Sequence, residues 1–159
     1  DESTAIDTIQ YEVRDAEMRR RYVTTVARRR MHQATFRERV VRAYHTQCSL
    51  CRLKHTELLD AAHITPDSDE TGEPVVTNGV ALCKLHHAAY DRHFISISPD
   101  YVVHVRPSIL DENDGPMLQH GLKGLHRAAI GVPSRAIDRP DRARLSDRHG
   151  MTLDIWAHG

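Results

Sequence analysis

The chain contains a long uninterrupted stretch of helix-forming residues. From Asp15 to Tyr44 no helix-breaking residue occurs, and near its end apolar residues recur at helical spacing, at Phe36, Val40, Val41 and Tyr44. This pattern predicts one long helix, or two helices in tandem, whose second half has an apolar face.

The middle of the chain has the pattern of a strand–loop–strand–helix unit. Residues 56–64 and 77–83 are short apolar segments typical of buried strands, and the second opens with the Asn-Gly turn signal. The polar residues 65–74 between them contain Pro and Gly, as loops do. Residues 84–93 then follow as a short helix.

The last third of the chain predicts a hairpin followed by a loop-rich tail. Residues 94–97 and 101–105 are apolar segments joined by Ser-Pro-Asp, which favours a tight connection. After Pro107 we expect a turn over 111–117, a short helix near 121–128 and a last helix around 139–150. Together these patterns predict a small α+β fold with three parts: a helical arm over 1–35, a central domain over 36–106 and a wrapping extension over 107–159.

Composition adds a reason to expect a metal. The 159 residues suit one domain, and 40% hydrophobic residues with only 5% aromatic residues predict a modest core that a bound metal would help to stabilise. No apolar run is long enough to span a bilayer, and the start does not resemble a signal peptide, so we expect a soluble, cytoplasmic protein. The chain begins at Asp1 without an initiator Met, which fits either a fragment of a longer protein with an upstream domain or a processed terminus.

Charge is balanced overall but unevenly distributed. Residues 1–55 carry 12 Lys and Arg against 7 Asp and Glu, whereas residues 56–100 carry 2 against 8. This distribution predicts a flank that grips phosphates beside a centre that binds cations. Two arginine triplets lie in the basic flank: Arg19, Arg20, Arg21, Arg28, Arg29 and Arg30. They either contact the DNA backbone or form a solvated helix surface.

Three cysteines and a histidine form two matched chelating pairs. Cys48 and Cys51 are separated by two residues, and so are Cys83 and His86. Two such pairs can close a tetrahedral structural zinc site. The alternatives are an ordinary buried thiol at Cys83 and a redox pair at Cys48 and Cys51, but the redox pair leaves the second half-site unexplained. Since adjacent side chains on a helix diverge by about 100°, His87 is expected to serve a different site from His86.

A second constellation resembles a nuclease signature. The spacing of His63, Asn78 and His87 resembles the His-Asn-His (HNH) motif, and the resemblance covers residues 36–105, nearest to McrA-like restriction-type domains. There, a zinc-binding cysteine pair precedes the motif and a second pair runs into its last histidine. His86 stands where many relatives have a fourth cysteine, which preserves a zinc ligand.

The resemblance implies a ββα-metal core and a role for each motif residue. His63 would be the general base that activates water, Asn78 would hold His63 in orientation, and His87 would bind a catalytic divalent ion, Mg²⁺ or Mn²⁺, with a transition ion such as Ni²⁺ as an alternative. A half-buried structural histidine at position 63 and a turn residue at position 78 are the plainer readings of these residues taken singly.

Two carboxylates are candidates for further metal contacts. Asp91 lies four residues after His87, on the same helical face, where it could instead form a cap or a surface salt bridge. Many HNH nucleases have Asp or His directly before the base, but Ala62 occupies that position here. Asp60 is the nearest carboxylate, able to reach the metal or to support a neighbouring group.

The resemblance implies a metal-dependent endonuclease of restriction type that cleaves DNA and leaves a 5′-phosphate and a 3′-hydroxyl. As a finer expectation, its specificity is for modified bases. A homodimer is an option because double-strand cleavage usually needs two active sites. Two other functions are alternatives: a non-catalytic zinc module that binds DNA through the basic arm, and a zinc domain that binds proteins.

Overall fold

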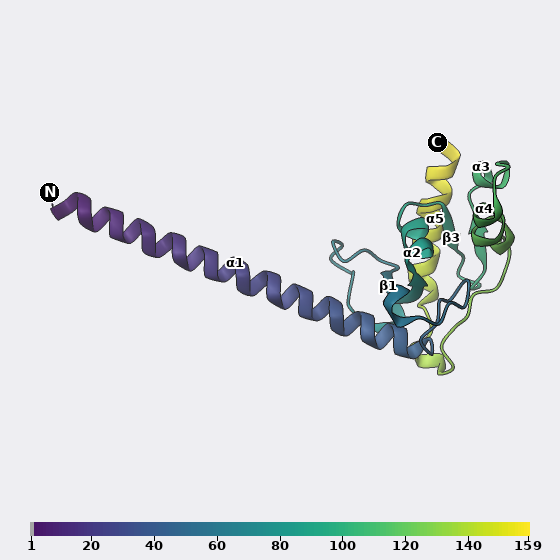
Figure 1. Cartoon of the computed structure of the whole chain (residues 1–159), viewed down its shortest axis with the longest axis horizontal. Coiled ribbons are helices and arrows are strands. Elements are labelled where there is room, and N and C mark those ends of the chain that lie inside the picture. Colours follow the sequence, from purple (N-terminus) through teal and green to yellow (C-terminus); the bar gives the residue numbers. More distant parts are fainter. Residues whose placement is uncertain (1) are drawn as a thin grey trace. The chain divides into compact units, whose positions relative to one another are not determined.

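The computed structural model describes residues 2–159, with side chains from Thr4 onward, and divides into two compact units, Asp1–Thr35 and Phe36–Gly159. Helix α1 (Glu2–Ala43) runs without a break from one unit into the other (Figure 1). The expected N-terminal helix is therefore a single helix, and it begins earlier than the sequence pattern predicts. No helix within residues 2–159 combines the length and apolar character needed to cross a membrane.

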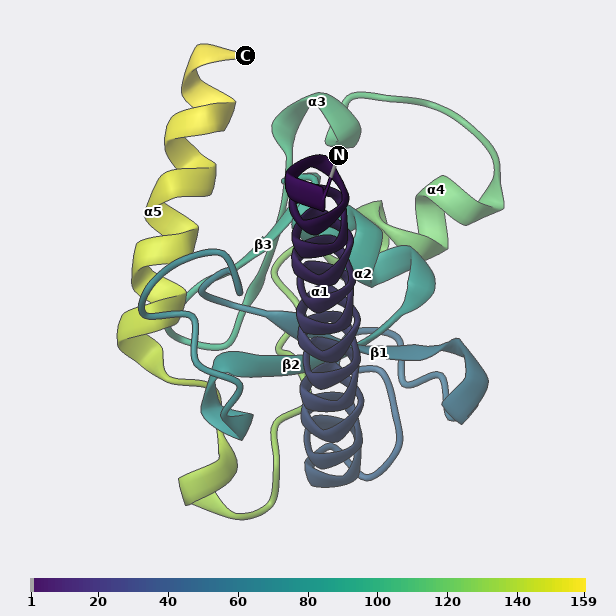
Figure 2. The ribbon, with the colours of Figure 1, turned by 90° about the vertical axis from the view of Figure 1, so that its left-hand side faces the viewer.

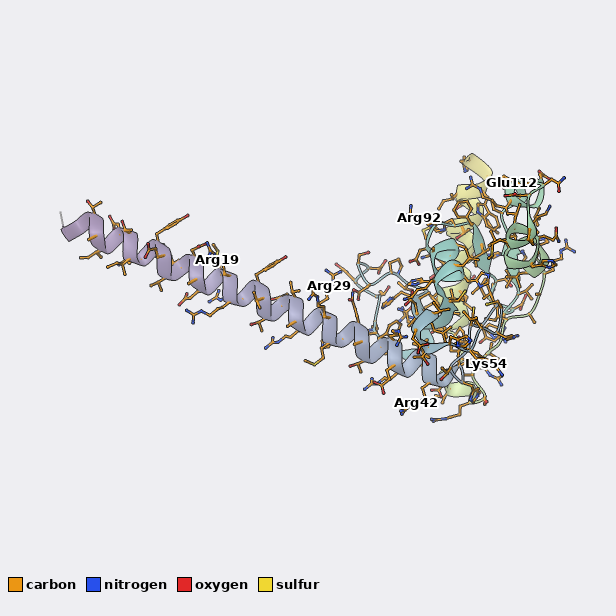
Figure 3. The ribbon with its side chains drawn as sticks, viewed as in Figure 1. Arg19, Arg29, Arg42, Lys54, Arg92 and Glu112 are labelled. Atoms are coloured by element: carbon orange, nitrogen blue, oxygen red, sulfur yellow. The ribbon has the colours of Figure 1, made fainter. Side chains whose placement is uncertain are left out.

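The first unit consists of α1 alone. Its side chains from Thr4 to Thr35 are almost all exposed, and the hydrophobic core includes no residue before Phe36. Arg19 forms an ion pair with Asp15 one turn earlier, with 2.7 Å between Nη2 and Oδ2. Figure 3 labels Arg19 and Arg29 among the side chains that project from this helix.

The second unit is built around the last two turns of α1. Phe36, Val40 and Val41 are at most 5% exposed, so the apolar face that the spacing predicts is the part of the helix that enters the core. Strand β1 (Leu59–His63) pairs antiparallel with β2 (Gly79–Cys83), and both strands contribute to the same core.

A ββα unit follows directly from this pairing. In the β1–β2 register Leu59 lies opposite Cys83 and His63 lies opposite Gly79. Helix α2 (Lys84–Asp91) begins at the residue after β2 and packs on both strands. Because α2 packs on β1, Asp60 of that strand contacts Lys84 and His87 of the helix.

The second strand is entered through a turn, as the sequence predicts, but Gly79 is not part of that turn. Residues Val76–Asn78 form a 3₁₀ turn, and Gly79 is the first residue of β2 with a φ of −125°, which any residue adopts. A Cβ atom on Gly79 would lie 2.5 Å from Cγ2 of Val40 and 2.9 Å from Cζ of Phe36. The glycine is therefore required by the close approach of α1 to the strand, which the sequence pattern does not reveal.

The rest of the second unit surrounds this core. Strand β3 (Ile95–Ile97) pairs antiparallel with β4 (Val103–Val105), which is the expected hairpin. Its remaining helices are α3 (Pro107–Leu110), α4 (Pro116–Gly121) and α5 (Arg142–His158). Helix α5 packs along β3 (Figure 2). Helix α5 extends further than the sequence pattern predicts. The boundary expected at residue 106 stays a prediction. Residues on both sides of it, such as Val105 and Ile109, contribute to one core.

Candidate active site and metal centre

Four side chains converge to form a candidate metal centre. Cys48 and Cys51 lie in the segment after α1, Cys83 ends β2, and His86 lies in the first turn of α2. Their ligand atoms all lie within 4.8 Å of one another, with 3.2 Å from Cys83 Sγ to His86 Nδ1 and 3.9 Å between the Sγ atoms of Cys51 and Cys83. Ligands at the corners of a zinc tetrahedron are about 3.5–3.8 Å apart. The group therefore has the composition and spacing of a structural zinc site.

The surroundings of the cluster prepare it for a cation. His86 is 1% exposed, and its Nε2 lies 2.6 Å from the carbonyl oxygen of Gly121, so Nε2–H donates there and Nδ1 faces the sulfur atoms. The Cys48 sulfur accepts hydrogen bonds from Cys83 and from His86, and these lower its pKa to about 3 despite its burial. The pKa of Cys83 is raised because it donates to Cys48. A zinc ion binds cysteine as the thiolate, so a lowered thiol pKa favours zinc binding.

His87 points away from this cluster. Its Nδ1 lies 2.9 Å from Oδ2 of Asp60, and its Nε2 lies 3.1 Å from Oδ2 of Asp91. The hydrogen bond with Asp91 is the main cause of a raised His87 pKa, with burial opposing it and Asp60 adding to it. The adjacent imidazoles therefore serve separate groups, as their helical positions require.

The two carboxylates around His87 have different geometries. Asp60 also pairs with Lys84, at 2.5 Å from Nζ to Oδ1, so both of its oxygens are engaged. The Asp91 side chain is 54% exposed, and its Oδ2 contacts His87 Nε2. Two ligands of one octahedral divalent ion at about 2.1 Å lie about 3 Å apart, which matches the separation of His87 Nε2 and Asp91 Oδ2. Asp60 has the position of a residue that orients His87.

His63 and His87 line the same pocket. The pocket has a volume of about 300 Å³ and is lined by His63, Pro66, Asp67, His87, Asp91 and Arg148. The His63 ring stacks on Phe36 with 4.3 Å between ring centres. Burial lowers the pKa of His63 below its ordinary value. The carboxylates of Asp67 and Asp91 oppose this shift but do not cancel it. The ring is therefore neutral at pH 7 and can accept a proton.

Asn78 holds the backbone directly after His63. It is fully buried; its Oδ1 accepts from the Thr65 amide at 2.8 Å, and its Nδ2 donates to the carbonyl oxygens of Thr65 and Glu73 at 3.1 and 2.9 Å. Its own carbonyl oxygen accepts from the Ile64 amide at 2.9 Å. These four bonds fix the exit from β1, and with it the position of His63.

Arg148 is a pocket residue that sequence reasoning missed. It comes from α5, is 7% exposed, stacks its guanidinium 4.6 Å from the Tyr90 ring centre, and donates from Nη2 to the Tyr90 carbonyl oxygen at 3.0 Å. Its buried Nε has no hydrogen-bond partner among the residues that the structure describes. The sequence offers no signal that separates Arg148 from the neighbouring arginines of α5, since only packing brings it to the pocket.

The remaining predicted residues divide between the two units. Ala62, at the position where many HNH nucleases carry a ligand, is fully buried in the core and supplies none. The two arginine triplets, Arg19–Arg21 and Arg28–Arg30, lie on α1 within the first unit, whereas all residues of the pocket belong to the second.

A family model matches the region that contains the candidate site. Residues 48–98 match the model of the HNH endonuclease family, a segment that begins at Cys48 and includes every residue of the metal cluster and of the predicted motif. A solved structure described as "Modification dependent TagI restriction endonuclease" aligns with a TM-score of 0.49 and 17% sequence identity, over 74% of this chain and 37% of that chain. This chain thus spans little more than a third of that protein's length. No curated protein matches the chain significantly in sequence.

Proposed function

We propose, from the premise that residues 48–98 belong to the HNH endonuclease family, that this chain hydrolyses phosphodiester bonds of DNA in a reaction that needs a divalent metal ion. The observation that carries the proposal is the pocket that both His63 and the His87–Asp91 pair line. A proton acceptor facing a pair of metal ligands is the arrangement that phosphodiester hydrolysis requires.

In this proposal His63 is the general base. The attacking water must lose a proton, and an imidazole that burial keeps neutral accepts one near pH 7. Stacking on Phe36 limits rotation of the ring, and the bonds of Asn78 to Thr65 fix the backbone beside it. Asn78 is then a positioning residue, which acts through His63 without touching the substrate.

His87 and Asp91 would hold the catalytic ion, and Asp60 would orient His87. Mg²⁺ or Mn²⁺ suits a site with one carboxylate and free positions for water and substrate oxygens, and a transition ion such as Ni²⁺ suits the imidazole. When bound, the ion neutralises charge on the transferred phosphate and on the leaving oxygen. The hydrogen bond from His87 Nδ1 to Asp60 leaves Nε2 toward the pocket, which is the usual way a ligand histidine is oriented.

Arg148 would bind the scissile phosphate. A guanidinium that lines the pocket and is already largely buried can donate to a phosphate oxygen with little further desolvation. Replacing Arg148 with Lys keeps the charge but removes the planar fork, so we expect the nicking rate to fall by a factor on the order of ten to a hundred. Arg144→Lys, one turn earlier on α5, is the matched control and should leave the rate near wild type. An unchanged rate in Arg148→Lys would show that the arginine only supports the Tyr90 carbonyl.

The arginine triplets of the arm would contact DNA phosphates. Such contacts give affinity that falls steeply with salt and carries little sequence information. A restriction-type function that depends on base modification then needs recognition elsewhere, in an upstream domain. Cleavage of methylated plasmid compared with unmethylated plasmid tests the modification dependence directly.

A plasmid-nicking assay separates the nuclease from the two non-catalytic alternatives. We expect the wild type to nick supercoiled DNA when Mg²⁺ or Mn²⁺ is added, and His63→Ala to lose nearly all of this activity. His55→Ala, at an exposed histidine before β1, is the matched control and should remain active. If the wild type binds DNA but never nicks it, the DNA-binding zinc module is the better assignment. If it does not bind DNA, the protein-binding domain is.

A further inference from the structure

The arm formed by the first unit exposes a row of apolar side chains. Ile6, Ile9, Val13 and Val23 are between 52% and 64% exposed, and they lie along one side of α1. An isolated helix gains little stability in water from its own backbone, and a continuous apolar row is usually covered by a partner.

The row follows a heptad repeat. Taking Ile6 as position a, the a and d positions alternate at steps of three and four residues: Ile6, Ile9, Val13, Ala16, Arg20, Val23, Ala27, Arg30 and Ala34. Seven of these nine residues are apolar. The repeat defines a seam of the kind along which two helices pack as a coiled coil, with arginine at two of its positions.

Charge is segregated along the same helix. Residues 1–18 contain six acidic residues and one basic residue, whereas residues 19–35 contain six arginines and no acidic residue. Interaction with the helix dipole favours acids near the start of a helix, but that effect is confined to the first turn and does not account for a boundary near the middle of the arm. The segregation matches a partner helix with the opposite order of charge.

We propose that the arm pairs antiparallel with the arm of a second copy of this chain, crossing at Met18. In that register each a position from Ile6 to Ala27 meets a d position of the other copy: Val13 meets Val23, Ile9 meets Ala27, and Ala16 meets Arg20. The acidic half of each arm then lies along the basic half of the other. The proposal does not rest on nuclease activity.

The antiparallel order separates each seam arginine from its own copy, since Arg20 faces Ala16 and Arg30 faces Ile6. In a parallel pair Arg20 would face Arg20 and Arg30 would face Arg30, and the Glu12 and Glu17 side chains of the two copies would flank the seam as like charges. In the antiparallel pair Arg20 packs its apolar stem on the small Ala16 and reaches Glu17 of the other copy with its charged end. Arg21 and Arg28 lie at outer positions of the repeat, so the pair keeps basic side chains on its surface.

Sedimentation of the full chain tests whether the arms associate. We expect a dimer at low salt that dissociates as salt rises, because the attraction between the halves is screened over about 10 Å at 0.1 M salt. The seam variant Ile9→Asn with Val13→Asn should be monomeric. The matched control, Tyr11→Asn with Met18→Asn, changes exposed side chains outside the seam and should remain a dimer. A monomeric wild type, or a seam variant that stays dimeric, overturns the proposal.

Disulfide trapping tests the orientation. Val13→Cys and Val23→Cys chains are mixed and oxidised, with the wild type as the control for its own three cysteines. Antiparallel pairing predicts disulfides between the two different chains, in excess over those of either chain with itself. Disulfides formed equally by each variant alone indicate parallel pairing and overturn the proposal. Neither test depends on cleavage, so failure here leaves the nuclease assignment to be judged by the nicking assay.

Discussion

Replacing each of the two adjacent histidines with alanine should have opposite consequences. His86→Ala removes one of the four ligands of the metal cluster. In small zinc domains a bound structural zinc ion contributes about 10–16 kcal/mol to the free energy of folding. Since a domain of this size is stable by about 5–15 kcal/mol in total, losing even part of that contribution should bring it close to unfolding. The same change also leaves the carbonyl oxygen of Gly121 without its donor.

His87→Ala should cost far less stability. The residue makes hydrogen bonds to Asp60 and Asp91, but its side chain is 27% exposed and that of Asp91 is 54% exposed, so solvent weakens both contacts. We expect a loss of about 1 kcal/mol, which lowers the melting temperature by about 3 °C. This variant should keep its zinc, yet nick DNA at a rate indistinguishable from background.

Thermal melts, zinc content per chain and plasmid nicking measured on the two variants together check this reasoning. The expected result is one variant that is unstable and low in zinc, and one that is folded, loaded with zinc and inactive. If His87→Ala melts as early as His86→Ala, or if His86→Ala retains a full zinc ion and the wild-type melting temperature, the assignment of the two rings to separate sites is wrong.

Three further predictions concern the residues around the pocket. Asn78→Ala should lower stability by about 2–4 kcal/mol in urea unfolding, since it leaves buried backbone groups of Thr65 and Glu73 unpaired, and an unchanged stability would contradict this. Gly79→Ala should cost about 1–3 kcal/mol in the same assay by overpacking against α1, whereas Gly115→Ala, with open space around it, should cost much less. With Mg²⁺ or Mn²⁺ at saturation, the ion and not a proton occupies His87, whose own pKa is raised. Under these conditions the nicking rate should be flat near neutral pH and fall below the lowered pKa of His63, because protonation removes the base; a rate already falling from pH 8 to 7 would point to a different group.

The sequence pattern was sufficient for the local elements and for the metal cluster. Each chelating pair supplies two ligands, and a tetrahedral zinc site needs four, so the sequence predicts that the two pairs come together. In the structure Cys48 and His86 do meet. The helical step of about 100° likewise separates His87 from His86 without knowledge of the fold.

The features that the sequence could not predict all depend on tertiary packing. Arg148 reaches the pocket only because α5 packs along β3, more than fifty residues after the motif ends. Gly79 looks like a turn residue, but its role comes from the approach of α1. Asp60 meets His87 because α2 packs on β1. The spacing of residues within either element does not reveal this contact.

The hydrogen bond between His86 and Gly121 has a consequence for where the chain can be divided. The histidine that belongs to the metal cluster takes its orientation from a carbonyl oxygen at the end of α4, outside the matched segment 48–98. An excised fragment that ends at Ser98 would lose that acceptor, as well as Arg148 and the buried Leu145. The part of the chain that must be kept to preserve the site is therefore larger than the segment that the family model matches.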